Sequence, residues 1–146
     1  MQDKTLKFES LLFSISRYLH RGHLLKKDEP LISFPQIVLL RQIKELKSPK
    51  MKDLAKELRV TLSNVSGLVD RLFLLGYVKR INDQKDRRVM RITLTPKGKN
   101  VCEKISEETN KCVKKLFSKI SQKDVENVIS IMQKLVNEIN KEEEKK

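Results

Sequence analysis

Short polar side chains and basic side chains are concentrated between residues 61 and 88. The first group follows the start of an expected helix, where short donors and acceptors can reach base edges in a groove. The second group lies in a short loop, where a guanidinium can enter a narrow minor groove and meet its negative potential. The two groups together are Thr61, Ser63, Asn64, Ser66, Arg71, Lys85, Asp86, Arg87 and Arg88.

Residues 53 to 94 must position these side chains, and their pattern predicts a helix, a tight turn, a second helix and two strands. Thr61 stands where the second helix needs an N-cap. Gly76 follows its end, where a glycine can adopt positive φ. An apolar stripe at i, i+3, i+4 and i+7 predicts its buried face, formed by Val65, Leu68, Val69 and Leu72.

The two strands are expected at Tyr77 to Ile81 and at Val89 to Leu94. The second strand alternates, which places one side in the core. The residues expected on that side are Met90, Ile92 and Leu94. A helix-turn-helix followed by a two-stranded basic wing is suited to a major groove and the adjacent minor groove of DNA.

The charge distribution favours a polyanionic partner. The chain has 32 Lys and Arg against 19 Asp and Glu, a formal net charge of +13. From Arg71 to Arg91 there are seven basic residues and two acidic ones. Nucleic acid is the expected partner, with steep salt dependence of binding. The alternative is a generally lysine-rich composition.

Length and composition indicate one folded, mostly helical domain outside the membrane. The chain has 146 residues, of which 38% are hydrophobic. No run approaches the roughly 18 apolar residues that a membrane span needs. The N-terminal ten residues mix acids and bases without the apolar segment of a signal peptide. A cytoplasmic protein is expected.

Capping residues predict where the remaining helices begin. Ser33 with Gln36 forms a capping box before a helix that ends near Leu46. Ser48, followed by Pro49, is expected to cap the next helix, and Thr95 with Pro96 the long helix that runs to about Ser118. Ser121 with Asp124 is expected to begin the last helix, and a first helix spans about residues 5 to 22.

The first and last helices carry more apolar surface than one small domain can cover. The expected stripe of the first helix is Phe8, Leu11, Leu12, Ile15, Tyr18 and Leu19, and that of the last helix is Val125, Val128, Ile129, Met132, Leu135, Val136 and Ile139. A second copy of the chain would cover both, and a two-fold dimer would present two recognition helices to a pseudo-palindrome. Ordinary packing within one chain is the alternative.

Cysteine and histidine residues indicate no metal or redox site. Cys102 and Cys112 are separated by about 15 Å of helix rise, which does not suit an intrachain disulfide. We expect both to be small buried hydrophobic residues. His20 and His23 could share a helix face, but a metal site needs three or four ligands and no nearby acid or cysteine completes a set. No cofactor is expected.

The run LAKELRVTLSNVSGLVDRL, followed by GYV, D-x-x-D-R-R and ITLTPKG, resembles the MarR family of winged-helix transcription regulators. The resemblance covers nearly the whole chain, and its most specific part is D-R-R followed by L-T-x-K-G. It implies a single MarR-type domain over residues 1–146. Within it, about 33–95 would form the winged helix-turn-helix, and 5–26 and 96–141 the dimerisation helices.

The resemblance also implies a function. Proteins of this kind are homodimeric regulators, most often repressors, that bind double-stranded DNA and are released by small-molecule effectors. No residue set in this sequence identifies an effector. By resemblance, Arg71 holds the DNA backbone or an internal ion pair, and Asp86 orients Arg88 by a bidentate pair. The chain has Gly67 where relatives often carry Arg, and Arg59 where they usually have Gly.

Other functions remain as alternatives. A winged helix can bind protein instead of DNA, and the small, uncharged side chains at Ser63, Ser66 and Gly67, together with Leu74, favour that alternative. A metal- or redox-sensing form of the regulator is a further one. An enzyme is not expected, because the sequence has no Gly-rich phosphate loop and no nucleophile with a nearby base.

Overall fold

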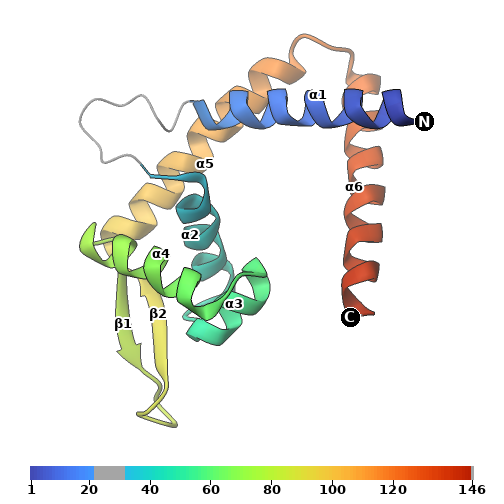
Figure 1. Cartoon of the computed structure of the whole chain (residues 1–146). Coiled ribbons are helices and arrows are strands. Elements are labelled where there is room, and N and C mark those ends of the chain that lie inside the picture. The colour runs from blue at the N-terminus through green and yellow to red at the C-terminus, as the bar shows by residue number, and fades with distance from the viewer. Residues whose placement is uncertain (22–31, 146) are drawn as a thin grey trace. The chain divides into compact units, whose positions relative to one another are not determined.

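The computed structural model describes residues 1–21 and 32–145 (Figure 1). The described part is mostly helical with a small antiparallel sheet, which confirms the expected fold class. The elements in chain order are α1 (Gln2–Arg21), α2 (Phe34–Leu46), α3 (Met51–Leu58), α4 (Leu62–Leu74), β1 (Val78–Asn82), β2 (Met90–Leu94), α5 (Pro96–Phe117) and α6 (Gln122–Glu144). His23, which could share a helix face with His20, lies outside the described residues.

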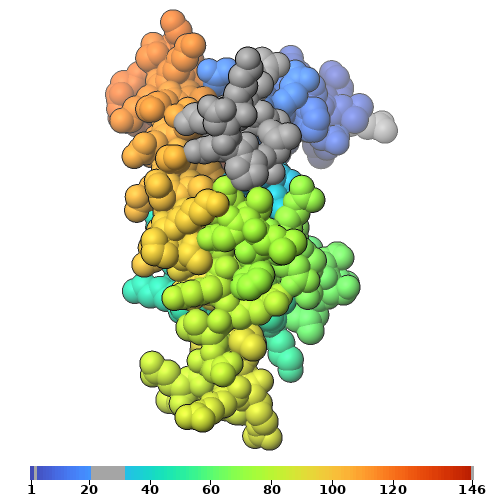
Figure 2. All heavy atoms as spheres, turned by 90° about the vertical axis from the view of Figure 1, so that its left-hand side faces the viewer, coloured from blue at the N-terminus to red at the C-terminus, as the bar shows by residue number. Residues whose placement is uncertain are grey.

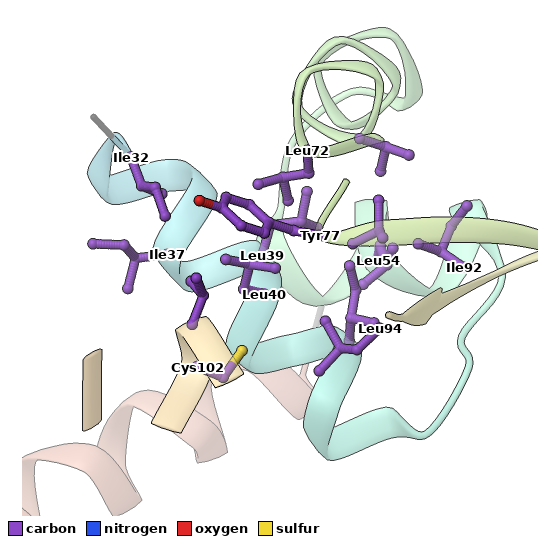
Figure 3. Packing of buried hydrophobic residues seen from close by; sticks show 14 of the residues in the cluster. Ile32, Ile37, Leu39, Leu40, Leu54, Leu72, Tyr77, Ile92, Leu94 and Cys102 are labelled. Carbon is purple, nitrogen blue, oxygen red and sulfur yellow. The ribbon is translucent and has the colours of Figure 1, made fainter. Parts of the chain in front are cut away.

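The core is built where α2, α3, α4, the hairpin and the start of α5 meet (Figure 3). Leu39 and Leu40 of α2 and Leu54 of α3 are fully buried there. The predicted stripe of α4 faces this core: Val65, Val69 and Leu72 are fully buried and Leu68 is partly buried against them. Burial of these side chains fixes which face of α4 points outward.

Most of the predicted helix starts are confirmed by their hydrogen bonds. Thr61 Oγ1 accepts the N–H of Asn64 at 3.2 Å, Thr95 Oγ1 accepts that of Gly98 at 3.0 Å, and Ser121 Oγ accepts that of Asp124 at 3.1 Å. At the start of α2, Gln36 Oε1 accepts the N–H of Ser33 at 2.8 Å. Each bond satisfies a backbone donor that a helix start leaves free. Gly76 has φ of +75°, as the predicted end of α4 requires.

The predicted start of α3 was wrong. Lys50, not Ser48, precedes the first turn, and its N–H donates to Asp53 Oδ2 at 2.9 Å. Ser48 adopts φ of +68° instead of the extended conformation of an N-cap. The backbone at Pro49 and Lys50 runs beside β2: the Pro49 carbonyl accepts the N–H of Ile92 at 2.9 Å, and Lys50 forms a bridge with Arg91. Because Pro49 and Lys50 pair with β2, α3 begins at Met51 and not directly after Ser48.

The sheet is a hairpin in which Val78 pairs with Leu94 and Asn82 pairs with Met90. Ile92 and Leu94 point into the core as predicted. The prediction that Met90 is buried was wrong, because 43% of its surface is exposed. Met90 lies two residues before Ile92 and therefore on the same side of β2. It is at the end of the strand nearest the wing tip, where no core residue covers it.

Residues 1–109 and 110–146 form two compact units. In the first unit, the apolar stripe of α1 is largely uncovered, with Phe8, Leu11, Leu12 and Ile15 between 46% and 54% exposed. In the second unit, the stripe of α6 is similarly uncovered from Val128 to Ile139, whereas Val125 is buried. These exposures fit the expectation that part of each stripe needs a partner; the division into winged and dimerisation parts stays a prediction. No helix within 1–21 or 32–145 is long and apolar enough to cross a membrane.

Candidate nucleic-acid interface

The start of α4 presents short polar side chains to solvent. Ser63 and Asn64 are exposed and Ser66 is half-buried. Across the described part of the chain, these three side chains form no hydrogen bond, so their donors and acceptors are available to a ligand. Thr61 differs, because its hydroxyl oxygen already accepts the N–H of Asn64. The structure thus brings the predicted base-contacting residues together on the outward face of one helix.

Arg71 lies two turns beyond Asn64, on the same side of α4. It is exposed, and no ion pair joins it to another described residue. Of the two roles that the resemblance implies, the structure therefore provides no internal ion pair for Arg71 within the described residues. A cation at this position remains available for a phosphate.

The acid on the outward face of α4 is neutralised by the wing. Asp70 accepts a hydrogen bond from the guanidinium of Arg80 in β1. The same guanidinium lies 5.4 Å from the centre of the Phe73 ring. This cation–π contact and the ion pair fix α4 to β1. Arg80 is not among the site residues predicted from the sequence, because no spacing rule links it to an acid ten residues earlier in a different element.

The wing tip is a tight turn with two arginines at its centre. The N–H of Val89 donates to the Asp86 carbonyl at 2.9 Å, which places Arg87 and Arg88 at the two middle positions of a β-turn. Both arginines are exposed, and the Arg88 side chain has 91% of its surface free. In Figure 2 the hairpin, drawn in yellow-green, projects below the body of the winged part. Both guanidinium groups therefore lie away from the core and are accessible to a ligand.

Asp86 orients the turn rather than gripping a guanidinium with both oxygens. Its Oδ1 accepts the backbone N–H of Arg88 at 3.0 Å and the Nε of the same residue at 3.3 Å. One carboxylate oxygen thus serves both bonds, whereas the sequence analysis expected a bidentate pair. Lys85 lies before this turn and is exposed, with its backbone N–H donating to Asp83 Oδ1 at 2.8 Å.

The base of the wing is held by Arg91, which the sequence analysis missed. Its Nε and Nη2 contact Asp83 Oδ2 at 2.9 and 2.8 Å, and its Nη1 donates to the Ser48 carbonyl at 2.9 Å. The bond from the Lys85 N–H and the bonds from Arg91 hold the pKa of the Asp83 carboxyl below its usual value. The sequence carries one signal for this pair: Asp83 follows the first expected strand, and Arg91 lies within the first three residues of the second.

The cysteines and histidines build no second site within the described residues. Cys102 is buried in the core, which raises the pKa of its thiol, and Cys112 is half-buried; both are free. No group of three metal-binding side chains occurs in the part of the chain that the structure describes. His20 packs edge-on against Phe34, with ring centres 4.3 Å apart.

A helix-turn-helix with an exposed second helix and a two-stranded, arginine-tipped hairpin defines a winged helix-turn-helix protein. The model of the MarR family matches residues 32–90, which include α2, α3, α4, β1 and the wing loop. This match confirms the resemblance to the MarR family over residues 32–90.

Relatives and solved structures agree with this assignment. The chain is 29% identical over 114 residues to the uncharacterized HTH-type transcriptional regulator YfiV of Bacillus subtilis. The matched stretch covers 76% of this chain and 71% of that one. It is similar to a MarR family protein from Bacillus stearothermophilus, with a TM-score of 0.79 and 26% identity over 96% of this chain and 98% of that one. FabT of Streptococcus pneumoniae, solved in complex with DNA, has a TM-score of 0.81 and 20% identity over 97% and 99% of the two chains.

Proposed function

We propose that this chain is a sequence-specific regulator of transcription that binds double-stranded DNA as a homodimer. The observation that carries the proposal is the pair of exposed arginines at the tip of a wing whose base is fixed to the helix-turn-helix by Arg91. The names of the relatives, HTH-type transcriptional regulators, support it. The DNA complex of FabT supports the same mode of binding by analogy of fold.

The recognition helix α4 would lie in the major groove. Ser63, Asn64 and Ser66 would contact base edges, Thr61 and Arg71 the phosphates, since short polar groups suit bases and long cations suit the backbone. Arg87 and Arg88 would enter the adjacent minor groove, with Lys85 on a phosphate and Asp86 keeping the turn in shape. These roles are supported by exposure and by the availability of the side chains for contact.

Dimerisation is supported by the uncovered apolar faces of α1 and α6. Side chains such as Phe8, Leu12 and Val136 are between 44% and 50% exposed, more than a stable monomer leaves on a continuous stripe. Two copies would present two α4 helices to a pseudo-palindromic operator. Repression, release by a small effector and a cytoplasmic location follow the same family pattern, and we propose no enzymatic activity.

The test is binding to DNA from the promoter region of the protein's own gene, measured by fluorescence anisotropy over a range of salt concentrations. Replacing Arg87 and Arg88 by alanine should weaken binding and reduce the salt slope by about 4, because the dimer loses two contacts from each of its two wings and each contact contributes about 1. A variant with Lys123 and Lys134 of α6 replaced by alanine loses the same charge and serves as the control. Equal affinities of the wing variant and the unmodified protein would refute the wing's role.

A second function, binding of a protein by the winged part, has one observation in its favour. Leu74 at the end of α4 is 84% exposed, and Phe73 beside it is 46% exposed. Replacing Leu74 by glutamate separates the two functions, because Leu74 has little burial to lose. Unchanged folding and unchanged DNA binding in this variant would leave the DNA proposal standing. DNA binding by the unmodified protein that is either absent, or weak and insensitive to salt, would favour the protein partner.

A further inference from the structure

The motif T-x-K-G at residues 95–98 contributes to the family resemblance, and none of the proposed DNA-contacting residues belongs to it. Its members Thr95, Lys97 and Gly98 lie between β2 and the first turn of α5. They contact residues 75–77, which connect the recognition helix α4 to the first strand of the wing (Figure 1). We call residues 75–77 the α4–β1 joint. The motif therefore contacts the connection between the two parts that would enter the two grooves of DNA.

Each of the three backbone carbonyls of the α4–β1 joint accepts a hydrogen bond from the motif. Lys97 Nζ donates to the Leu75 carbonyl at 2.9 Å. Thr95 Oγ1 donates to the Gly76 carbonyl at 2.6 Å, and the Thr95 backbone N–H donates to the Tyr77 carbonyl at 3.0 Å. The end of a helix leaves such acceptors without a partner inside the helix. Two residues of the motif thus satisfy every backbone acceptor of the joint.

The α4–β1 joint has few other contacts that would hold it in one conformation. Gly76 adopts φ of +75°, and glycine has more backbone freedom than any other residue. Leu72 and Tyr77 are buried on either side of this glycine, but Leu75 packs only partly against the core. A segment with little burial depends on its hydrogen bonds. The angle between α4 and β1 should therefore depend on the bonds from the motif.

Lys97 contacts all three residues of the joint from the surface. Its ammonium group lies at the C-terminal end of α4, where the helix dipole favours a cation. The same group is 5.1 Å from the centre of the Tyr77 ring, in a cation–π contact. Its stem passes over Gly76, where a Cβ would lie 3.8 Å from Lys97 Cδ. Because Lys97 is exposed, it can be replaced without opening a cavity in the core.

We propose that Lys97 is a positioning residue for DNA recognition. It fixes the angle between α4 and the wing, so that the recognition helix and the wing arginines enter their grooves at the same time. Two linked binding elements gain from each other only when their geometry allows both to bind at once. The inference rests on the proposed function, because the angle matters only if both elements contact one duplex.

The first test is Lys97→Met, which keeps most of the stem and removes the ammonium group. Binding to the promoter duplex should weaken at least about fivefold in fluorescence anisotropy, because a charge-assisted hydrogen bond and the fixed angle are lost. Binding to an unrelated duplex of the same length should change by less than about twofold, since non-specific binding depends on phosphate contacts. Circular dichroism and Tm report whether the fold persists. An equal loss on both duplexes would indicate a folding or charge effect and overturn the inference.

Lys99→Met is the matched control, because it removes the same charge from the same turn of α5. Lys99 is exposed and forms no hydrogen bond or ion pair within residues 1–21 and 32–145. Its replacement should leave both affinities within about twofold of those of the unmodified protein, as expected for an exposed charge without a partner. A loss of promoter binding as large as that of Lys97→Met would overturn the role of the joint.

The salt dependence of binding separates positioning from direct contact. Lys97→Met should keep the salt slope of the unmodified protein, because Lys97 bonds the α4–β1 joint and not a phosphate. A phosphate contact would instead contribute about 1 for each of the two Lys97 side chains of the dimer, so that its loss reduces the slope by about 2. A reduction of that size would make Lys97 a DNA contact and overturn the positioning role.

A double-mutant cycle tests the angle itself. Replacing Arg87 and Arg88 by alanine should cost less affinity in Lys97→Met than in the unmodified protein, by a factor of at least about three, because a wing at the wrong angle contributes less. The full cost should remain in Lys99→Met. Equal costs in all three backgrounds would show that the wing does not depend on Lys97 and overturn the inference. Failure of the proposed function differs, because the unmodified protein would then bind both duplexes equally or be insensitive to the loss of Arg87 and Arg88.

Discussion

Nη2 of Arg91 lies 2.8 Å from Oδ2 of Asp83, and the same guanidinium donates to the Ser48 carbonyl. One side chain of β2 thus joins the start of the wing loop to the turn after α2. Together with the Asp70–Arg80 pair and the bond from the Ile92 N–H to the Pro49 carbonyl, this contact fixes a two-stranded hairpin that would be marginally stable by itself. The position of the wing arginines relative to α4 therefore depends on Arg91.

Replacing Arg91 by alanine should lower DNA affinity roughly tenfold, about 1.4 kcal/mol, although Arg91 is not at the wing tip. The loss arises because Asp83 and the Ser48 carbonyl lose their partner. The hairpin is then no longer held in one orientation relative to the turn after α2. Fluorescence anisotropy measures the affinity, and near-unchanged helical circular dichroism shows that the core persists. In a double-mutant cycle with Asp83→Asn, the two losses should be less than additive. Full additivity would show that the pair does not act as a unit.

The Asp83 pair also predicts a pH dependence. The pKa of Asp83 in the folded protein lies below its unfolded value of about 3.9. The hydrogen bond from the Lys85 N–H and the ion pair with Arg91 therefore contribute stability that is fully present above that value and is lost as the pH falls through the lowered folded pKa. The difference in Tm between the unmodified protein and Asp83→Asn should be constant from pH 7 to pH 5 and narrow below about pH 4. A difference that is independent of pH down to pH 2 would contradict this origin.

Much of the fold could be predicted because local rules and burial agree in this chain. The stripe of Val65, Val69 and Leu72 and the caps at Thr61 and Thr95 depend only on nearby residues, and the structure confirms them. The start of α3 could not be found in this way. There, a non-local pairing with Ile92 overrides the local preference of Ser48 and Pro49 for a helix start.

In the candidate site, too, some contacts could be predicted from nearby residues and others could not. The wing tip follows from local turn chemistry around Asp86, so its arginines could be identified from spacing. The contacts of Asp70 with Arg80 and of Arg91 with Ser48 join residues ten and 43 positions apart. Such partners depend on how α4 and the α2–α3 turn pack against the hairpin, which no periodicity encodes.

Gly98 permits a close approach that a larger residue would prevent. A Cβ at this position would lie 1.9 Å from the carbonyl oxygen of Tyr77, which also accepts the N–H of Thr95 at 3.0 Å. The first turn of α5 therefore packs directly on the start of the hairpin. Gly98→Ala should destabilise the protein by about 1–3 kcal/mol, as overpacking does, and lower Tm by several degrees in thermal unfolding. An unchanged Tm would mean that α5 can shift at no cost.

At Gly67, replacement by alanine should have the opposite effect on stability. This variant is therefore the matched control for Gly98→Ala. Nothing lies within 4 Å of a Cβ at Gly67, which faces solvent from the middle of α4. Gly67→Ala should raise stability by about 1 kcal/mol, because glycine is the poorer helix former. If Gly67 allows the backbone to approach DNA closely, the same variant should bind DNA more weakly. Higher Tm with unchanged affinity would refute the close approach and keep the helix argument.

Arg59 combines an unfavourable backbone conformation with a charge next to the recognition helix. It ends α3 with φ of +53°, two residues before Thr61, in a region where a non-glycine residue costs roughly 1–2 kcal/mol. We infer that the arginine contributes a phosphate contact that offsets this cost.

Arg59→Gly should therefore weaken DNA binding, with the salt slope of the dimer reduced by about 2, which is about 1 for each of its two Arg59 side chains. Arg59→Asn is the matched variant, since asparagine tolerates the left-handed region and removes the charge without adding the flexibility of glycine. Both variants should show the same loss of affinity, measured by anisotropy at several salt concentrations, because the loss comes from the guanidinium. If only Arg59→Gly weakens binding, flexibility of the turn and not the charge is responsible; if neither does, Arg59 has no role at the DNA.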